Sequence, residues 1–171
     1  MVLTVIGADR PGLVQRLADV VLSHGGSWER SQLAQLAGLF AGIVVVEVPD
    51  GRAAELRGAL GALDGVLHVA VHPGVGRPST ATTARAVTLD LLGNDRPGIV
   101  RELSAVFAGH GLSITDLTTD SREAPMAGGR LFEAHVSAET GPDVDLDALR
   151  EELEGVAAEL MIDLTLHPPQ F

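Results

Sequence analysis

The hydrophobic positions of this chain follow two alternating periods, one typical of strands and the other typical of helices. Residues 1–8, MVLTVIGA, form a short apolar run that predicts a buried strand. A helix is predicted next, because Leu13, Leu17 and Val21 recur at the spacing of helical turns. Two strands, a second helix and a last strand are predicted at residues 27–38, 39–48, 52–63 and 66–72.

The second half of the chain repeats this order. VIGADRPGLVQRLADVVLSHGGS, starting at Val5, aligns without a gap to LLGNDRPGIVRELSAVFAGHGLS, starting at Leu91. His72 and His167, each followed by Pro, also match, but the second copy has gained about nine residues by then. We place the added residues in 122–129 and around 140–143, where turn-forming residues cluster. The elements predicted for this half are residues 86–92, 97–109, 113–121, 130–138, 145–160 and 161–167.

A strand-helix-strand-strand-helix-strand order predicts an antiparallel sheet with two helices on one face, the ferredoxin-like fold. The chain is therefore predicted to be an α+β protein of two tandem ferredoxin-like domains. Residues 74–85 are rich in Gly, Ser and Thr and read as a linker. The predicted domains are residues 1–73 and 86–171.

Composition excludes several functions. The 171 residues are 46% hydrophobic and 20% charged, which is typical of a globular protein. The absence of Cys excludes disulfides and thiolate chemistry. The net charge is -11, and the chain contains Arg but no Lys. A negative charge of this size opposes direct binding to nucleic acid. No leader or membrane-spanning run is recognised, so a cytoplasmic location is expected.

The acidic residues are concentrated on the last predicted helix and just before it. Its apolar positions lie on one side and its carboxylates on the other. A solvated helix face is the favoured interpretation, and a recognition surface for a basic partner is the alternative. These residues are Asp143, Asp145, Asp147, Glu151, Glu152, Glu154 and Glu159.

The repeated tetrapeptide Asp-Arg-Pro-Gly joins a strand to a helix in each half. Pro11 is predicted at the first helical position, and Asp9 and Asp95 are predicted to face the positive helix end. In ordinary helical geometry a glycine after the first helical position costs about 1 kcal/mol relative to Ala. Gly12 and Gly98 therefore indicate that some other group packs closely against the backbone there. The approaching group is either another chain segment or a ligand, and free N–H groups at a helix start favour a carboxylate.

The pattern DRPG followed by Leu or Ile and Val, a helix ending in His-Gly, and a strand beginning Ser-Trp or Ser-Ile resembles the ACT domain. ACT domains are small regulatory modules that sense amino acids. Two tandem copies that fill the chain resemble the glycine cleavage system transcriptional repressor family. This resemblance implies a non-enzymatic regulator with an effector bound near the first strand-helix loop and the start of the second strand.

Carried over position by position, the resemblance implies ligand-binding residues in both halves. The second loop is preferred, because Asn94 carries an amide donor and acceptor where Ala8 carries neither. Trp28 is expected to pack in a core or interface more than against a ligand. The positions are Ala8, Asp9, Arg10, Pro11, Gly12, Leu13, Ser27, Trp28 and Glu29, and Asn94, Asp95, Arg96, Pro97, Gly98, Ile99, Ser113, Ile114 and Thr115.

No motif for catalysis or for a cofactor is present, and the histidines are not spaced as metal ligands. His24 and His110 are interpreted as caps of matching helix ends. We expect no enzyme activity, no cofactor and no metal. The expected partners are a small amino acid, a second copy of the chain and a protein such as a DNA-binding regulator. A ligand-free interaction or dimerisation module and a regulatory subunit of a metabolic enzyme are the alternatives.

Overall fold

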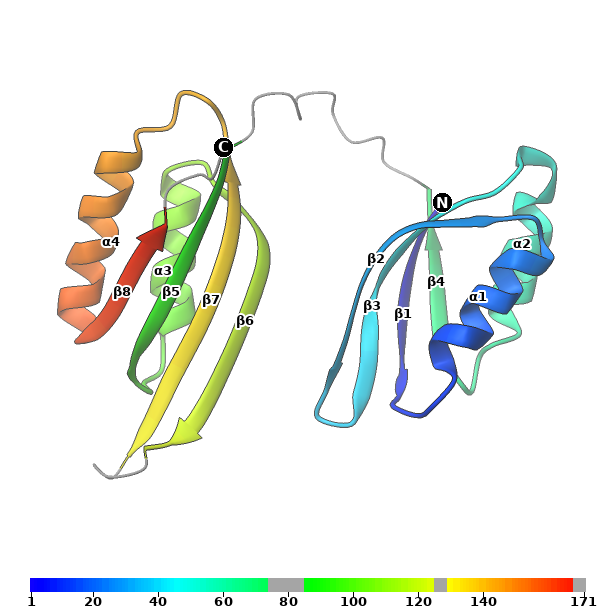
Figure 1. Cartoon of the computed structure of the whole chain (residues 1–171), viewed down its shortest axis with the longest axis horizontal. Coiled ribbons are helices and arrows are strands. Elements are labelled where there is room, and N and C mark those ends of the chain that lie inside the picture. The colour runs from blue at the N-terminus through cyan, green and yellow to red at the C-terminus, as the bar shows by residue number, and fades with distance from the viewer. Residues whose placement is uncertain (74–84, 125–128, 168–171) are drawn as a thin grey trace. The chain divides into compact units, whose positions relative to one another are not determined.

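The structure is a computed structural model that describes residues 1–73, 85–124 and 129–167. The chain divides into two compact units, one in each half. Each unit is a four-stranded antiparallel sheet with two helices on one face (Figure 1), which confirms the predicted α+β architecture. The predicted linker, residues 74–85, lies outside the described residues except for Arg85, which begins a strand.

The order of elements is the same in both domains. Both sheets also share one strand order, β2-β3-β1-β4 in the first and β6-β7-β5-β8 in the second, with every neighbouring pair antiparallel. The first domain contains β1 (Val2–Ala8), α1 (Leu13–Ser23), β2 (Ser27–Leu36), β3 (Leu39–Glu47), the 3-10 turn η1 (Asp50–Arg52), α2 (Ala53–Gly61) and β4 (His68–His72). The second contains β5 (Arg85–Asn94), α3 (Ile99–Gly109), β6 (Ser113–Glu123), β7 (Arg130–Thr140), α4 (Leu146–Leu160) and β8 (Ile162–His167).

The second copy is longer mainly in one hairpin. Ser27 pairs with Glu47 in the first sheet, and Ser113 pairs with Glu139 in the second. The offset between equivalent residues therefore rises from 86 to 92 along the hairpin, so the β6-β7 hairpin contains six added residues, four of them in the connection between the strands. This agrees with the predicted insertion at residues 122–129, of which 125–128 lie outside the described residues.

Each domain has its own core between its sheet and its helices. In β1 the side chains of Leu3 and Val5 are buried, whereas alternate positions face away from the helices, as the two-residue period of a strand requires. Leu17 of α1 and Leu56 of α2 are buried against them. The second core is built in the same way around Leu89 and contains Phe107 and Leu153. Burial thus follows the predicted hydrophobic faces.

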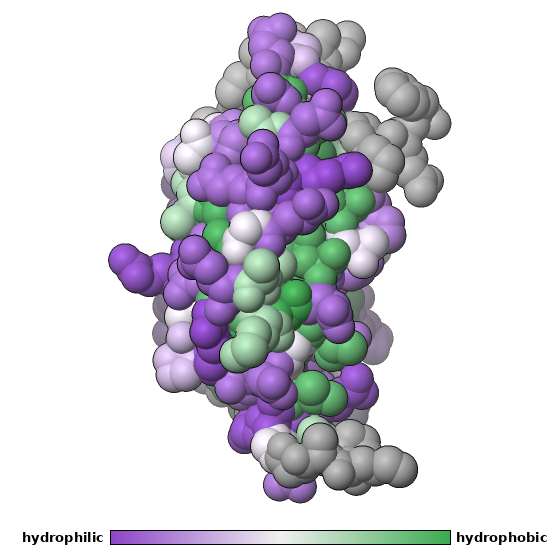
Figure 2. Space-filling view, turned by 90° about the vertical axis from the view of Figure 1, so that its left-hand side faces the viewer, coloured by the Kyte–Doolittle hydropathy of each residue, from purple (hydrophilic) through white to green (hydrophobic). Residues whose placement is uncertain are grey.

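Helix α4 presents its carboxylates to solvent. The Asp145 side chain caps the helix by accepting hydrogen bonds from the N–H groups of Asp147 and Ala148 at 3.0 and 3.1 Å. Leu149 and Leu153 are buried on the opposite side. Figure 2 shows the side of the second domain that carries the helices, where hydrophilic side chains predominate. The predicted division of the helix into an apolar and an acidic face is confirmed.

In the described ranges, no helix has the length and apolar character needed to cross a membrane.

The ends of α1 and α3 carry the predicted His and Gly in both domains. Gly25 and Gly111 follow α1 and α3 with φ of 71° and 72°, the left-handed geometry of a helix stop. His24 Nδ1 donates to the Val20 carbonyl at 2.8 Å, which confirms its capping role. His110 likewise stands at the C-cap of α3, and its side-chain Nε2 donates to Glu152 of α4 at 2.8 Å. His110 therefore joins the two helices of its domain.

The prediction that Pro11 occupies the first helical position is wrong. Helix α1 begins at Leu13, after Gly12 with φ of 88°, and α3 begins at Ile99, after Gly98 with φ of 102°. These are left-handed backbone conformations that a residue with a Cβ adopts only at a cost. The strand therefore turns into the helix through glycine.

The left-handed conformation of Gly12 and Gly98 explains these glycines, and a close approach of another group to the backbone does not. A Cβ added to Gly12 would meet no described atom within 4 Å, and one added to Gly98 would meet only the Glu102 side-chain oxygen at 3.5 Å. Close packing of another segment is therefore not the reason for either glycine. The positive φ accounts for both without a ligand.

We expect Gly12→Ala to lower the free energy of unfolding of the first domain by about 1 kcal/mol or more, because Ala is strained at positive φ. Urea unfolding followed by the fluorescence of Trp28, the single Trp, reports this domain. Gly58→Ala is the matched control, since Gly58 lies in α2 with open space around it. It should raise stability by up to about 1 kcal/mol. Equal effects of the two substitutions would contradict the argument.

Candidate functional site

The predicted site residues lie at opposite ends of the first sheet. Ala8 ends β1 opposite Leu39, and the Asp9 N–H donates to the Gly38 carbonyl at 2.9 Å, so the loop lies beside the β2-β3 turn. Ser27 begins β2 opposite Glu47, at the other end of the sheet. The seven residues of β1 separate the two sets by about 20 Å. The first domain alone does not bring them together.

The second domain has the same separation. Asn94 pairs with Leu131, and the Asp95 N–H donates to the Arg130 carbonyl at 2.8 Å. Ser113 instead pairs with Glu139 at the far end. In each domain the predicted ligand residues therefore fall into two separate groups, one in the first strand-helix loop and one at the start of the second strand. The loop group contains the N–H groups at the helix start.

Several predicted ligand residues are part of the cores. Leu13 and Ile99 are buried, so their side chains serve packing. Trp28 and Ile114 are half-buried and pack against the cores of their domains, which agrees with the structural role expected for Trp28. The remaining positions reach the surface, with Arg96 partly buried: Ala8, Asp9, Arg10, Pro11, Gly12, Ser27, Glu29, Asn94, Asp95, Arg96, Pro97, Gly98, Ser113 and Thr115.

Glu29 and Thr115 occupy β-bulges. The register of β2 against β3 shifts between Trp28 and Arg30, and that of β6 against β7 shifts between Ile114 and Asp116. The Thr115 hydroxyl donates to the Ser137 carbonyl at 3.2 Å. The start of the second strand is therefore irregular in both domains.

Asp95 is held by the neighbouring hairpin. Ser121 Oγ donates to its carboxylate at 2.5 Å, and Arg130 Nε lies 3.4 Å from the same oxygen. Arg130 also donates to the Ser121 carbonyl at 3.1 Å. Neither α1 nor α3 receives a side-chain cap, so the hydrogen bonds of Asp95 go to the hairpin and not to the helix start. Gln35 and Gly38 stand at the equivalent positions of the first domain, which lacks this network.

Asn94 lies on the side of its strand that faces away from the helices. Leu89 and Leu91 of β5 are buried, and a Cβ on Gly93 would strike Ile162 on the core side. The next residue, Asn94, is exposed and follows the alternation to the outer face. Its amide and the N–H groups at the start of α3 therefore lie on different sides of the strand end.

A hollow of about 230 Å³ adjoins the first loop. It is lined by Ala8 at the end of β1 and Arg10 of the loop, and by Asp64 before β4 and His68 at its start. His68 Nδ1 lies 3.4 Å from Asp64 Oδ1. A guanidinium and a carboxylate at one hollow provide complementary charges for the two ends of an amino acid.

Sequence reasoning missed Asp64 and His68. They lie more than fifty residues after the loop, and β4 reaches it only because Ile6 pairs with His68 across the sheet. Neither residue belongs to a recognisable motif. Comparison of the two repeats does not single out His68 either, since the equivalent position of the second repeat is occupied by Asp163.

A second polar cluster lies on the outer face of the second sheet. His135 Nδ1 and His167 Nε2 donate to the two oxygens of Asp90 at 2.6 and 2.8 Å. These hydrogen bonds hold the pKa of Asp90 below its ordinary value of 3.8, and the one from His135 has the larger effect. Over the described stretches, no three His, Cys, Asp or Glu side chains are arranged to hold a metal ion. The cluster is thus a set of exposed hydrogen bonds.

With this geometry in place, comparison with protein families defines the class. Residues 1–72 and residues 87–154 each match a model described as the ACT domain. The chain belongs to the ACT-domain proteins and contains two such domains in tandem.

Relatives match across both domains. The chain is 26% identical to the glycine cleavage system transcriptional repressor of Escherichia coli (strain K12), over 94% of this chain and 85% of the repressor. A crystal structure of an unknown protein from Galdieria sulphuraria has a TM-score of 0.84 at 26% identity, covering 99% of this chain and 97% of that one. A crystal structure provisionally described as a glycine cleavage system transcriptional repressor has a TM-score of 0.68 at 19% identity, covering 97% and 94%. The last likeness supports the fold alone.

Removal of the Asp95 carboxylate should loosen the hairpin of the second domain. We expect Asp95→Ala to cost about 1 kcal/mol, because the Ser121 hydroxyl and the Arg130 guanidinium lose a shared acceptor. Hydrogen–deuterium exchange should then accelerate in peptides from β6 and β7. Asp9→Ala, at the equivalent position of the first domain, should change exchange in β2 and β3 much less. Equal acceleration in both domains would rule out the network as the cause.

The Asp90 cluster predicts a pH-dependent contribution to stability. A carboxylate with a depressed folded-state pKa adds stability above its unfolded-state pKa and loses it as pH falls through the folded value. Asp90→Asn should therefore lower the melting temperature slightly at about pH 6, and the difference should disappear once the pH falls below the lowered folded-state pKa of Asp90. The effect is small because the side chain is half exposed. Asp163→Asn, which removes a carboxylate from the same face, is the control, and the same pH profile there would contradict the assignment.

Proposed function

We propose that this protein is a non-enzymatic regulator that binds a small amino acid and thereby changes its association with a protein partner. The observation that carries the proposal is the match to the transcriptional repressor, which extends over 94% of this chain and so includes both ACT domains. Regulation of transcription in amino-acid metabolism, with glycine as the first effector to test, follows from that relative.

The hollow beside Arg10 supports an amino-acid ligand. The Arg10 guanidinium suits the ligand carboxylate, and the Asp64 carboxylate suits its ammonium group. A hollow of about 230 Å³ accommodates a small side chain and little more. In the second domain the Asp95 carboxylate is held by a short hydrogen bond from Ser121 at 2.5 Å, whereas the contact of Asp64 with His68 is longer, at 3.4 Å, so the first loop is the better place for an ammonium group.

The charge supports action through a protein. A net charge of -11 repels the phosphates of DNA, so the effect on transcription passes through a partner that itself binds DNA. The exposed carboxylates of α4 offer a surface for a basic region of such a partner. The ligand acts by linkage: it favours the conformation for which it has the higher affinity, and the partner distinguishes the two conformations.

A ligand-free interaction module is the second candidate. It is favoured by the positive φ of Gly12 and Gly98, which explains the repeated glycines without a ligand. The engagement of Asp95 by Ser121 and Arg130 likewise gives that residue a structural role.

Titration calorimetry of the full chain with glycine, serine, alanine and the branched amino acids separates the two candidates. We expect one of the small amino acids to bind, and Arg10→Ala to weaken its binding by about tenfold or more through loss of a charge-assisted hydrogen bond. Asn94→Ala tests the second loop in the same way, and Arg96→Ala is the matched control for loss of a loop arginine.

The outcomes are distinct. If no amino acid binds at millimolar concentration, the sensor function fails and the interaction module remains. If binding occurs and is weakened by Asn94→Ala but not by Arg10→Ala, the ligand occupies the second loop. Circular dichroism of each variant confirms that the loss of binding is not a loss of folding.

A further inference from the structure

The hollow beside Arg10 contains a group whose charge changes near neutral pH. Among the described residues that line it, three have ionisable side chains: Arg10, Asp64 and His68. Guanidinium and carboxylate groups ordinarily keep their charges between about pH 5 and pH 8, whereas an imidazole changes its charge within this range. His68 is therefore the lining residue whose protonation alters the charge of the hollow.

The backbone carries Asp64 and His68 to the same place. Gly65 follows Asp64 with φ of 90°, a left-handed conformation that lets the chain turn before β4. A Cβ on Gly7 of β1 would lie only 2.7 Å from the Val66 carbonyl oxygen, so this turn lies directly against β1. The turn is thus fixed against the sheet, and both side chains reach the hollow from it.

A proton on His68 and the ammonium group of a ligand compete for Asp64. His68 Nδ1 lies 3.4 Å from Asp64 Oδ1, and the two side chains are 67% and 74% exposed. The contact is longer than a typical N–H···O hydrogen bond, so a neutral imidazole leaves the carboxylate able to attract a cation. A protonated imidazole places a full positive charge there. That charge offsets the carboxylate and repels an ammonium group.

Other charged groups lie away from His68. Its neighbour in the sheet is β1, which pairs with it through Ile6 and contains no charged residue. Helix α2 also packs against β4, but its Glu55 and Arg57 belong to the helical layer on the other face of the sheet (Figure 1). His72, on the same face of β4, is four residues and therefore about 13 Å away. The charge of His68 thus acts mainly on the two other ionisable groups of the hollow.

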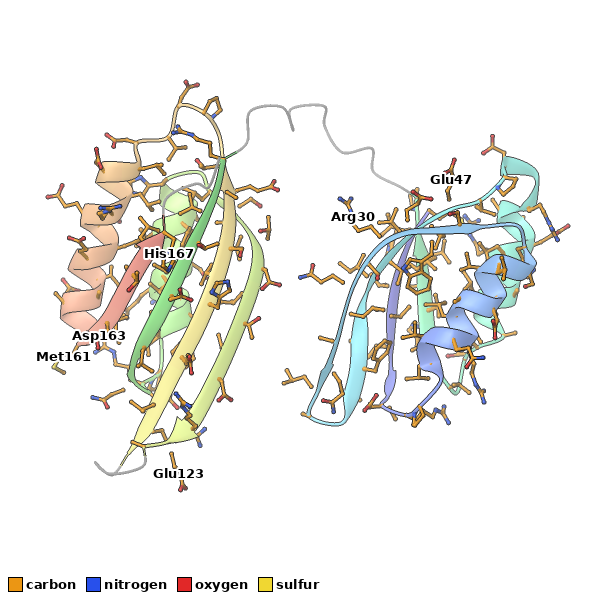
Figure 3. The ribbon with its side chains drawn as sticks, viewed as in Figure 1. Arg30, Glu47, Glu123, Met161, Asp163 and His167 are labelled. Atoms are coloured by element: carbon orange, nitrogen blue, oxygen red, sulfur yellow. The ribbon has the colours of Figure 1, made fainter. Side chains whose placement is uncertain are left out.

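The second domain has no histidine at the equivalent position. Ile6 pairs with His68 in the first sheet, and its equivalent Leu92 pairs with Asp163 in the second. Figure 3 shows Asp163 near the start of β8. A carboxylate at this position does not ordinarily change its charge near neutral pH. A dependence on the protonation of this residue is consequently expected at the first loop and not at the second.

We infer that a small amino acid in this hollow binds in competition with the protonation of His68, so that its affinity rises from about pH 5.5 to about pH 7.5. The inference rests on the proposed binding of an amino acid beside Arg10 and adds a regulation of that site by pH. Linkage gives the sign: since the proton weakens binding of the ligand, the ligand weakens binding of the proton by the same factor, and protons are released when it binds. A fall in pH then acts on the regulator as a fall in the amino-acid concentration does.

Titration calorimetry of the full chain with glycine, serine and alanine at about pH 5.5, 6.5 and 7.5 tests this inference. For the amino acid that binds, we expect the dissociation constant to fall about three- to fivefold over this range, because two unit charges about 5 Å apart interact weakly at an exposed site. Titrations in two buffers with different ionisation enthalpies count the protons. A fraction of one proton should be released per ligand near pH 6.5, where histidine is partly protonated.

A matched pair of histidine substitutions makes the test specific. His68→Gln keeps a polar side chain that cannot gain a charge, so it should remove the pH dependence and the proton release, whatever its effect on affinity at pH 7.5. His72→Gln is the control on the same strand. The His72 ring is hydrogen bonded to the Thr4 hydroxyl at 3.1 Å and does not line the hollow, so this variant should keep the full pH dependence. Far-ultraviolet circular dichroism at each pH checks that both variants are folded.

The failure of this inference is distinct from that of the sensor function. If none of the three amino acids binds at any pH, both fail. If one binds with the same affinity at every pH, or if the pH dependence survives His68→Gln, the inference is overturned and the sensor function stands. Tighter binding at acidic pH would also overturn it, since His68 would then attract the ligand carboxylate instead of competing with its ammonium group.

Discussion

The alternation of side chains along each strand is the constraint on which the rest of this structure depends. In β1, Leu3 and Val5 face the helices, so Thr4 and Ile6 must face the other way. One face of each sheet must consequently carry the apolar residues of a core, whereas the residues of the other face are not restricted by packing against the helices. The two ACT domains keep the first face alike, since both bury aliphatic side chains against two helices. They differ on the second face, where Asp90, His135 and Asp163 of the second domain stand at the positions of Thr4, Ile43 and His68 of the first.

The strand-helix junction shows a similar separation between shared and variable features. The turn from strand to helix passes through Gly12 or Gly98 in a left-handed conformation, so both domains keep Asp-Arg-Pro-Gly for a backbone reason. Around this common turn the neighbours differ. Asp95 is bound by the hairpin residues Ser121 and Arg130, whereas the first loop adjoins a hollow that Asp64 helps to line. A repeated motif therefore serves two local environments.

Sequence reasoning recovered the fold well and the site only in part. Hydrophobic period located each α-helix and strand of the described residues, because burial against a sheet selects residues at regular spacing, but it gave no signal for the 3-10 turn at Asp50–Arg52. The family resemblance, in contrast, placed Leu13 and Ile99 among the ligand residues, although both are in the cores. The resemblance grouped the loop with the start of β2, and the structure separates these by the length of β1. Asp64 escaped notice because its approach to the loop depends on the pairing of β4 with β1.

The sequence by itself determined the tandem repeat, the α+β class, the family and the acidic character of α4, because each of these is written in local spacing or composition. Only the tertiary structure decided why the junction needs glycine, which partners Asp95 and Asp90 have, and how the outer faces of the two sheets compare. Backbone φ and the register between strands govern those features. Register brings together residues that are far apart along the chain, and no local pattern encodes it.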